Sequence, residues 1–134
     1  MGSEKWDFDQ RAASWDKNPR RVKLANDIAD AISGEQILTP DMDVLEFGCG
    51  TGLLTLQLRP LVRSVTAVDS SQGMLSVFQK KAADRKLANA NAVLFDLEAG
   101  TELPGRYDVI VSSMTLHHIQ ATEVLLNKLY AALK

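Results

Sequence analysis

An apolar run that leads into three closely spaced glycines constrains this chain more than any other feature of its sequence. Residues 44–47 read Val-Leu-Glu-Phe, and residues 48–52 read Gly-Cys-Gly-Thr-Gly. We expect the apolar run to form a buried strand and the residues after it to turn sharply into a helix. Because glycine tolerates unusual dihedrals and allows close approach, this loop can hold a ligand against the main chain, near the free N–H groups of the helix start.

The rest of the chain alternates between strand-like and helix-like segments. Strands are predicted over residues 43–47, 64–69, 92–96 and 107–113. Helices are predicted over residues 22–33, 52–59, 71–87 and 121–133. Near-continuous apolar strands between helices indicate an α/β fold, a doubly wound parallel sheet of about four strands with helices on both faces. The turn Thr39-Pro40-Asp41 separates an N-terminal helical cap, residues 1–39, from this domain, residues 40–134.

Polar side chains end all four predicted strands. They are Glu46, Asp69, Asp96 and Ser112. In open parallel sheets, ligands bind outside the carboxyl ends of the strands. We therefore expect these four residues to surround a binding site together with the glycine loop.

The composition of the chain argues against a nucleic acid partner, a membrane span and a bound metal. The 134 residues carry 15 basic and 17 acidic side chains, a formal charge of −2, which gives no electrostatic argument for a nucleic acid partner. No apolar run reaches the roughly 18 residues of a membrane span, and the first residues have no signal-peptide core. We therefore expect a cytoplasmic protein. The single cysteine, Cys49, excludes an intrachain disulfide and provides no metal-ligand spacing, so no metal is expected.

A carboxylate followed by Gly-x-Gly-x-Gly resembles motif I of the class I S-adenosylmethionine-dependent methyltransferases. The stretches 68–75 (Val-Asp-Ser-Ser-Gln-Gly-Met-Leu) and 107–119 resemble further motifs of that family. The resemblance covers residues 40–134. It implies a Rossmann-like fold, S-adenosylmethionine as the cofactor and S-adenosylhomocysteine as its product. A small-molecule methyl acceptor is implied as well.

The resemblance also implies contacts to the methionine end of the cofactor. Glu46 would face the cofactor's amino group, Gly52 would complete the loop, and Ser112 belongs to the stretch that floors this end. The carboxypropyl chain would lie along Gly48, Cys49 and Gly50.

At the adenosine end, the resemblance makes Asp69 the acceptor for both ribose hydroxyls. Ser70 and Met74 would border the adenosine. Asp96 would accept from the exocyclic amine of adenine, and the Leu97 main chain would donate to the ring.

Catalytic residues are harder to read, because methyl transfer from a sulfonium needs alignment and exclusion of water more than acid–base groups. His117 and His118 are the candidates, as a substrate contact or a base; alternatively they only begin the next segment. Cys49 is interpreted as a small residue that fits beneath the loop. Trp15 and Phe8 would either line a lid over the cofactor or pack against the helix 22–33.

Two other functions stay open. A dinucleotide-binding dehydrogenase places its third glycine three positions after the second, where this chain has Leu53. That spacing disfavours NAD as the cofactor. A non-catalytic module that binds S-adenosylmethionine is the second alternative, and the sequence does not separate it from an enzyme.

Methyltransferases of this class usually continue past the segment that ends here at Lys134, with a fifth strand and an antiparallel pair. We interpret the chain as the cofactor-binding portion, truncated at its C-terminus. The fourth strand would then be an exposed edge, and exposed edges promote association. We expect a homodimer through this edge, which light scattering would detect.

Overall fold

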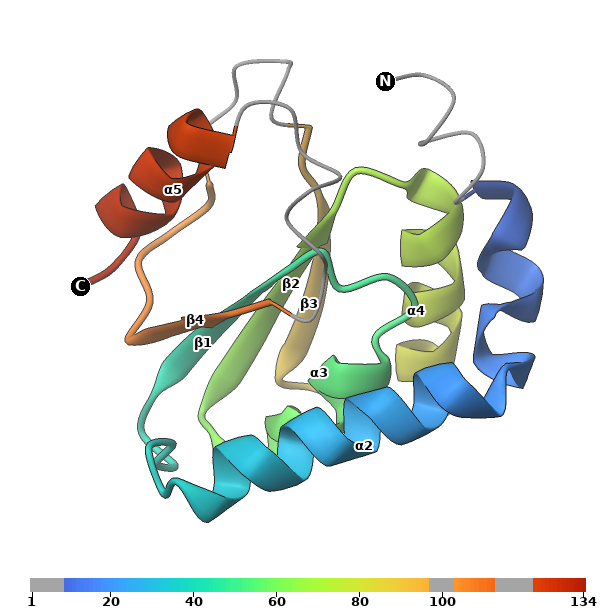
Figure 1. Cartoon of the computed structure of the whole chain (residues 1–134), viewed down its shortest axis with the longest axis horizontal. Helices are drawn as coiled ribbons and strands as arrows, with labels where there is room; N and C mark the ends of the chain where they lie inside the picture. Colours follow the sequence, from blue (N-terminus) through green and yellow to red (C-terminus); the bar gives the residue numbers. More distant parts are fainter. Residues whose placement is uncertain (1–8, 97–102, 113–121) are drawn as a thin grey trace.

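The computed structural model describes residues 9–96, 103–112 and 122–134. Helices follow β1, β2 and β4, whereas β3 is followed by β4 in the described order of elements (Figure 1). The strands are β1 (Asp43–Phe47), β2 (Ser64–Asp69), β3 (Ala90–Leu94) and β4 (Val109–Val111). The helical elements are η1 (Ala12–Lys17), α2 (Pro19–Gly34), α3 (Leu53–Leu58), η2 (Arg59–Leu61), α4 (Gln72–Asp84) and α5 (Thr122–Ala131).

All four strands form one parallel sheet in the order β3-β2-β1-β4. Glu46 of β1 pairs with Ala67 of β2 on one side and with Val111 of β4 on the other. The sequence order of the strands reverses at β1, so the loop after β1 leaves the sheet at its switch point. This is where open α/β sheets bind ligands.

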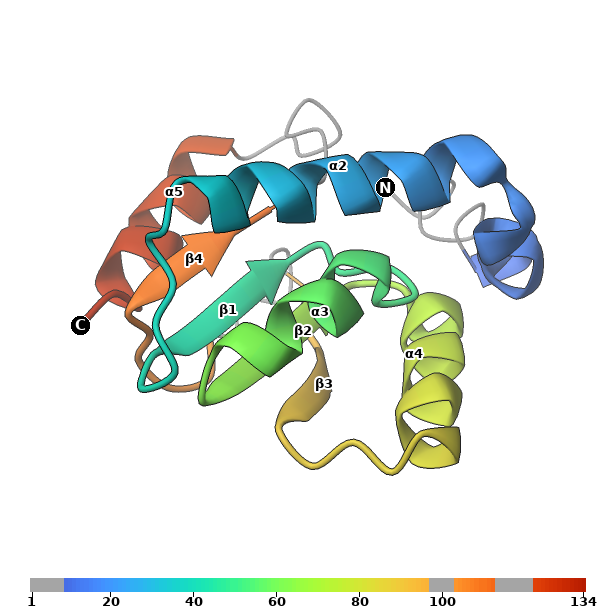
Figure 2. The same ribbon diagram turned by 90° about the horizontal axis from the view of Figure 1, so that it is seen from below.

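Helices cover both faces of the sheet, which confirms the predicted α/β architecture. Ala67 packs with residues of α4, and Val111 packs with residues of α2 and α3, so these three helices share the face that carries Glu46. Figure 2 shows α2 running alongside α3 on this side. Leu45 and Phe47 point to the other face, in a cluster with Leu129 of α5.

The ends of β1 and β2 match the prediction, whereas the helix ends differ from it, most at the start of α2 and the end of α4. α2 begins at Pro19, before the predicted residue 22, because Asn18 accepts a hydrogen bond from the Arg20 N–H at 2.9 Å and proline suits the first helical position. α4 ends at Asp84, before the predicted residue 87. Lys86 has a φ of 53°, a left-handed conformation that commonly ends helices.

The outer two strands differ from the prediction: β3 (Ala90–Leu94) begins and ends two residues before the predicted 92–96, and β4 (Val109–Val111) is shorter than the predicted 107–113. β3 stops at Leu94, where its pairing with Asp69 ends, so Asp96 follows the strand and does not close it. Before β4, the Tyr107 N–H donates to the Ala132 carbonyl at 2.8 Å, and a parallel bridge joins Tyr107 to Leu133. Along β4 itself, β1 is the one partner among the described residues. A homodimer through this edge remains a prediction.

Within the described ranges, no helix combines the length and apolar character needed to cross a membrane. The same ranges hold no group of three or more histidine, cysteine or acidic side chains arranged to bind a metal.

Ser71 caps the helix that follows β2. Its Oγ accepts a hydrogen bond from the Met74 N–H at 3.1 Å and donates to the Asp9 carboxylate. We expect Ser71→Ala to lower the free energy of unfolding by about 1 kcal/mol, because a cap hydrogen bond is lost. Urea denaturation measures this change, with Ser76→Ala on the exposed side of α4 as the control. An equal loss in both variants would contradict a capping role.

Candidate functional site

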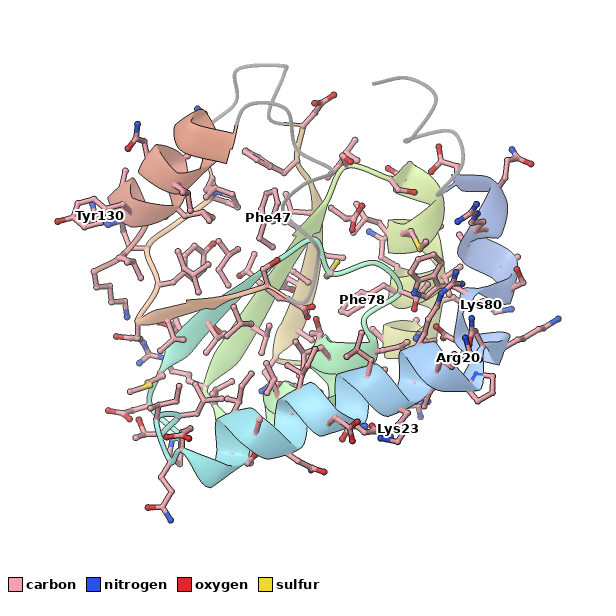
Figure 3. All side chains as sticks on the ribbon, viewed as in Figure 1. Arg20, Lys23, Phe47, Phe78, Lys80 and Tyr130 are labelled. Atoms are coloured by element: carbon pink, nitrogen blue, oxygen red, sulfur yellow. The ribbon has the colours of Figure 1, made fainter. Side chains whose placement is uncertain are left out.

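The loop between β1 and α3, residues 48–52, has a backbone that requires glycine at three positions. Gly48, Gly50 and Gly52 have φ values of 73°, 57° and 85°. Side chains rarely adopt this left-handed region. At Gly52 there is also no room, because a Cβ would lie 1.9 Å from Cδ2 of Phe78. Figure 3 shows Phe78 reaching from α4 toward this loop.

Three main-chain N–H groups of the loop donate hydrogen bonds to carbonyl groups of the protein itself. The N–H groups of Gly48 and Cys49 donate to the Val68 carbonyl of β2 at 2.8 and 3.0 Å. The Gly52 N–H donates to the Cys49 carbonyl at 3.0 Å. These bonds tie the loop to β2 and hold its shape before any ligand arrives.

Asp69 at the end of β2 is fixed by two main-chain donors. Its Oδ2 accepts from the Gly50 N–H at 2.8 Å and its Oδ1 from the Ser71 N–H at 2.9 Å. The side chain is only partly buried, and this burial raises the pKa of Asp69 above its usual value against the opposing effect of the main-chain hydrogen bonds. A carboxylate oxygen can accept more than one hydrogen bond, so both oxygens can also accept donors from a ligand.

Glu46 is fully buried on the face covered by α3. Its Oε1 accepts a hydrogen bond from the Thr55 hydroxyl, whereas its Oε2 has no hydrogen-bond partner within the described parts of the chain. Burial raises the pKa of Glu46 to about 8. A buried carboxyl oxygen without a donor is costly, so this atom marks a position where a donor from a ligand would be favourable.

Hydrogen bonds join neighbouring strand ends. The Ser112 hydroxyl donates to the Phe47 carbonyl at 2.9 Å, and the Phe95 N–H donates to the Asp69 carbonyl at 2.9 Å. Asp96 comes one residue after this bond and is partly exposed. The carboxyl ends of the four strands therefore meet at one edge, as the sequence predicted. Leu97, His117 and His118 lie outside the described residues.

Two predicted contact residues are largely buried side chains. Met74 is 1% exposed, and its Sδ is 3.9 Å from the position a Cβ on Gly50 would take, so it packs beneath the loop. Cys49 is buried as well, and burial raises the pKa of its thiol well above its usual value. A thiol of raised pKa is a poor nucleophile, which agrees with the packing role expected for Cys49. Ser70, between strand and cap, is half-buried.

A pocket lies between the glycine loop and the first turns of α2. Its lining combines loop residues with side chains of the N-terminal segment. They are Trp15, Arg21, Leu24, Ala25, Gly48, Cys49, Gly50, Thr51, Leu53 and Leu54. Of the described residues expected from the sequence to bind the cofactor, those at 48–50 line this pocket, and the others do not.

The sequence named Trp15 and Phe8 as candidate lid residues; Trp15 lines this pocket, and Phe8 lies outside the described residues. Sequence reasoning missed the acidic side chains that fasten the N-terminal segment beside the pocket. Asp16 of η1 accepts from the Thr51 hydroxyl and forms an ion pair with Lys81 of α4 at 2.6 Å. Asp9 accepts from the Gly73 N–H at 2.8 Å. No local pattern in the sequence links residues that are 35 to 65 positions apart, so these contacts could be found only in three dimensions.

A parallel α/β sheet with a glycine loop at its switch point, and a fixed carboxylate at the next strand end, defines a class of nucleotide-binding folds. A family model described as a methyltransferase domain matches residues 44–134. The chain belongs to the class I S-adenosylmethionine-dependent methyltransferases.

Characterised and uncharacterised relatives share the matched region. An uncharacterized methyltransferase of Schizosaccharomyces pombe is 32% identical over 100 residues, which are 69% of this chain and 35% of the relative. A malonyl-[acyl-carrier protein] O-methyltransferase of Bacillus cereus is 29% identical over 126 residues, which are 92% of this chain and 45% of the relative. The chain thus spans less than half the length of these two relatives.

Solved structures of methyltransferases share the fold. One from Clostridium acetobutylicum matches with a TM-score of 0.72 and 26% identity, over 95% of this chain and 53% of its own. Coclaurine N-methyltransferase, solved with N-methylheliamine and S-adenosylhomocysteine, matches with a TM-score of 0.72 and 26% identity, over 82% of this chain and 32% of its own.

Proposed function

We propose that the strand-end site binds S-adenosylmethionine and that the protein transfers its methyl group to a small molecule. In this proposal Asp69 accepts hydrogen bonds from the ribose hydroxyls, and Glu46 accepts from the ammonium group. The cofactor's carboxypropyl chain lies along the loop, at Gly48, Cys49, Gly50 and Gly52. Ser70, Met74, Asp96, Leu97 and Ser112 complete the cofactor site.

The geometry of Asp69 carries this proposal. Two main-chain N–H groups, from Gly50 and Ser71, hold its carboxylate at 2.8 and 2.9 Å. A rigid carboxylate next to a glycine loop suits a vicinal diol, because each oxygen can accept one hydroxyl without moving. A dehydrogenase would use a similar carboxylate, but its glycine spacing differs from the one at residues 48–52.

The carboxylate of Glu46 supports the proposed cofactor independently of Asp69. Its Oε2 is buried and has no donor among the described residues, whereas the Thr55 hydroxyl donates to Oε1. An ammonium group would supply the missing donor and favour the ionised carboxylate.

The bound sulfonium supplies an activated methyl group, so the chain's own residues need to orient the cofactor and exclude water. By their names, one relative is an O-methyltransferase of malonyl-[acyl-carrier protein] and one structural neighbour is an N-methyltransferase of coclaurine. The class of acceptor atom is therefore left open, and a small molecule is proposed because the chain carries no basic excess for nucleic acid.

Calorimetric titration with S-adenosylmethionine, S-adenosylhomocysteine and NAD tests the proposed cofactor. We expect both sulfur nucleotides to bind and NAD not to bind. Asp69→Asn should weaken their binding by about 1–3 kcal/mol, because the hydroxyls lose a charged acceptor. Asp84→Asn, at the far end of α4, is the matched control. Unchanged affinity in Asp69→Asn would contradict the ribose assignment, and binding of NAD alone would overturn the proposed cofactor.

A further inference from the structure

Among the described residues, the lining of the pocket beside the glycine loop includes one cationic side chain and no acidic one. Its lining is mostly apolar, from Leu24, Ala25, Leu53 and Leu54, and none of its ten lining residues is an aspartate or glutamate. Arg21 is the one charged residue among them.

Trp15 holds this cation from one side. The guanidinium carbon of Arg21 lies 3.5 Å from the centroid of the Trp15 ring, in a cation–π contact. No ion pair joins Arg21 to a carboxylate anywhere in the part of the chain that the structure describes. Stacking leaves the planar edge of a guanidinium available, and that edge matches a carboxylate with two parallel hydrogen bonds.

The acid nearest in sequence is already engaged elsewhere. Asp16 accepts from the Thr51 hydroxyl and pairs with Lys81 at 2.6 Å. These two bonds fasten the segment that carries Trp15 to the loop and to α4. Arg21 is therefore held at a fixed position beside the loop, with its charge not neutralised by a neighbouring acid of the described chain.

We propose that Arg21, stacked on Trp15, binds a carboxylate in this pocket. The proposal rests on the function proposed above, because a carboxylate beside the glycine loop comes either from the methionine end of the cofactor or from the methyl acceptor. If it is the cofactor's, Arg21 and Glu46 together bind the two charges of an amino acid group, one at each side of the loop.

Titration with S-adenosylmethionine and its decarboxylated analogue tests the first source. The analogue keeps the sulfonium and the ammonium group and lacks only the carboxylate. We expect the wild-type protein to bind S-adenosylmethionine at least tenfold more tightly than the analogue. Arg21→Gln should abolish this preference and leave binding of the analogue unchanged, which also shows that the variant is folded. Arg20→Gln, the exposed neighbour on α2, should retain the preference (Figure 3).

Titration with hexanoate and hexanamide tests the second source, with and without S-adenosylhomocysteine. Tighter binding of hexanoate than of hexanamide in the wild type, lost in Arg21→Gln and kept in Arg20→Gln, would assign the carboxylate to the acceptor. If Arg21→Gln alters neither preference, the proposal is overturned. A wild-type protein that binds neither sulfur nucleotide would instead refute the proposed function, and hexanoate alone would then decide the role of Arg21.

Discussion

Gly52→Ala is expected to damage this protein more than any other single methyl group added to the loop. The new Cβ would lie 1.9 Å from Cδ2 and 2.3 Å from Cε2 of Phe78, a side chain that is 1% exposed and packed in the core. The φ of 85° at this position adds a backbone penalty for any side chain. Together, overpacking and the left-handed backbone should lower the free energy of unfolding by roughly 2–5 kcal/mol.

Chemical denaturation measures this loss, and two further variants identify its cause. Gly34→Ala, at the end of α2, adds the same methyl group where nothing lies within 4 Å, so we expect it to be neutral or slightly stabilising. Adding Phe78→Leu to Gly52→Ala should restore part of the stability, because the smaller side chain relieves the contact. A Gly52→Ala protein as stable as Gly34→Ala would show that the loop and α4 are not packed as described.

Much of the sheet could be predicted from the sequence because its central strands, β1 and β2, are largely buried on both faces. Apart from Glu46 and Thr66, β1 and β2 are apolar between a polar first residue and the glycine or aspartate at which they end, so their ends were placed correctly. The ends of β3 and β4 were not, because they depend on pairing. β3 stops where its register with β2 ends, and Tyr107 pairs with the residues after α5.

The residues of the candidate site likewise fall into two groups, those predicted from local sequence patterns and those that depend on tertiary contacts. The glycine loop and Asp69 follow from local patterns, a strand that leads to a turn and a carboxylate at a strand end. Arg21 and Asp16 do not, because their partners Trp15, Thr51 and Lys81 come together only when η1 packs beside α4 and Asp16 contacts both α4 and the loop. The sequence predicted a buried strand around Glu46 but does not show which donors lie beside its side chain. The carboxyl oxygen of Glu46 that lacks a partner among the described residues therefore could not be anticipated.

Glu46 should make the protein less stable as the pH rises through neutrality. Burial raises its pKa to about 8 in the folded protein, against an ordinary value of 4.5. Between these values the folded state retains a proton that the unfolded state has lost, so the free energy of unfolding falls with rising pH. At about 1.4 kcal/mol per pH unit for one proton, the loss from pH 5.5 to 7.5 is about 2–3 kcal/mol.

Glu46→Gln removes this titration and isolates its contribution. Its amide oxygen can still accept from Thr55, and its pH-independent cost cancels when each protein is compared with itself at the two pH values. Urea denaturation of the wild type should show the loss of about 2–3 kcal/mol, and Glu46→Gln should lose much less. Asp43 and Asp108, with pKa values held below the usual range by hydrogen bonds to Arg63 and to the main chain, titrate at lower pH and do not contribute in this interval. Equal slopes in both proteins would mean that Glu46 is ionised when folded.

The same protonation state ties Glu46 to the proposed ammonium contact. A free protein with a pKa of about 8 at this residue holds the proton at pH 7, whereas an ammonium group beside Oε2 favours the ionised form. Binding of S-adenosylmethionine at pH 7 should therefore release a proton from the wild type and none from Glu46→Gln. Calorimetry in two buffers of different ionisation enthalpy counts that proton. Binding without proton release from the wild type would place the ammonium group away from Glu46, even if the cofactor assignment itself holds.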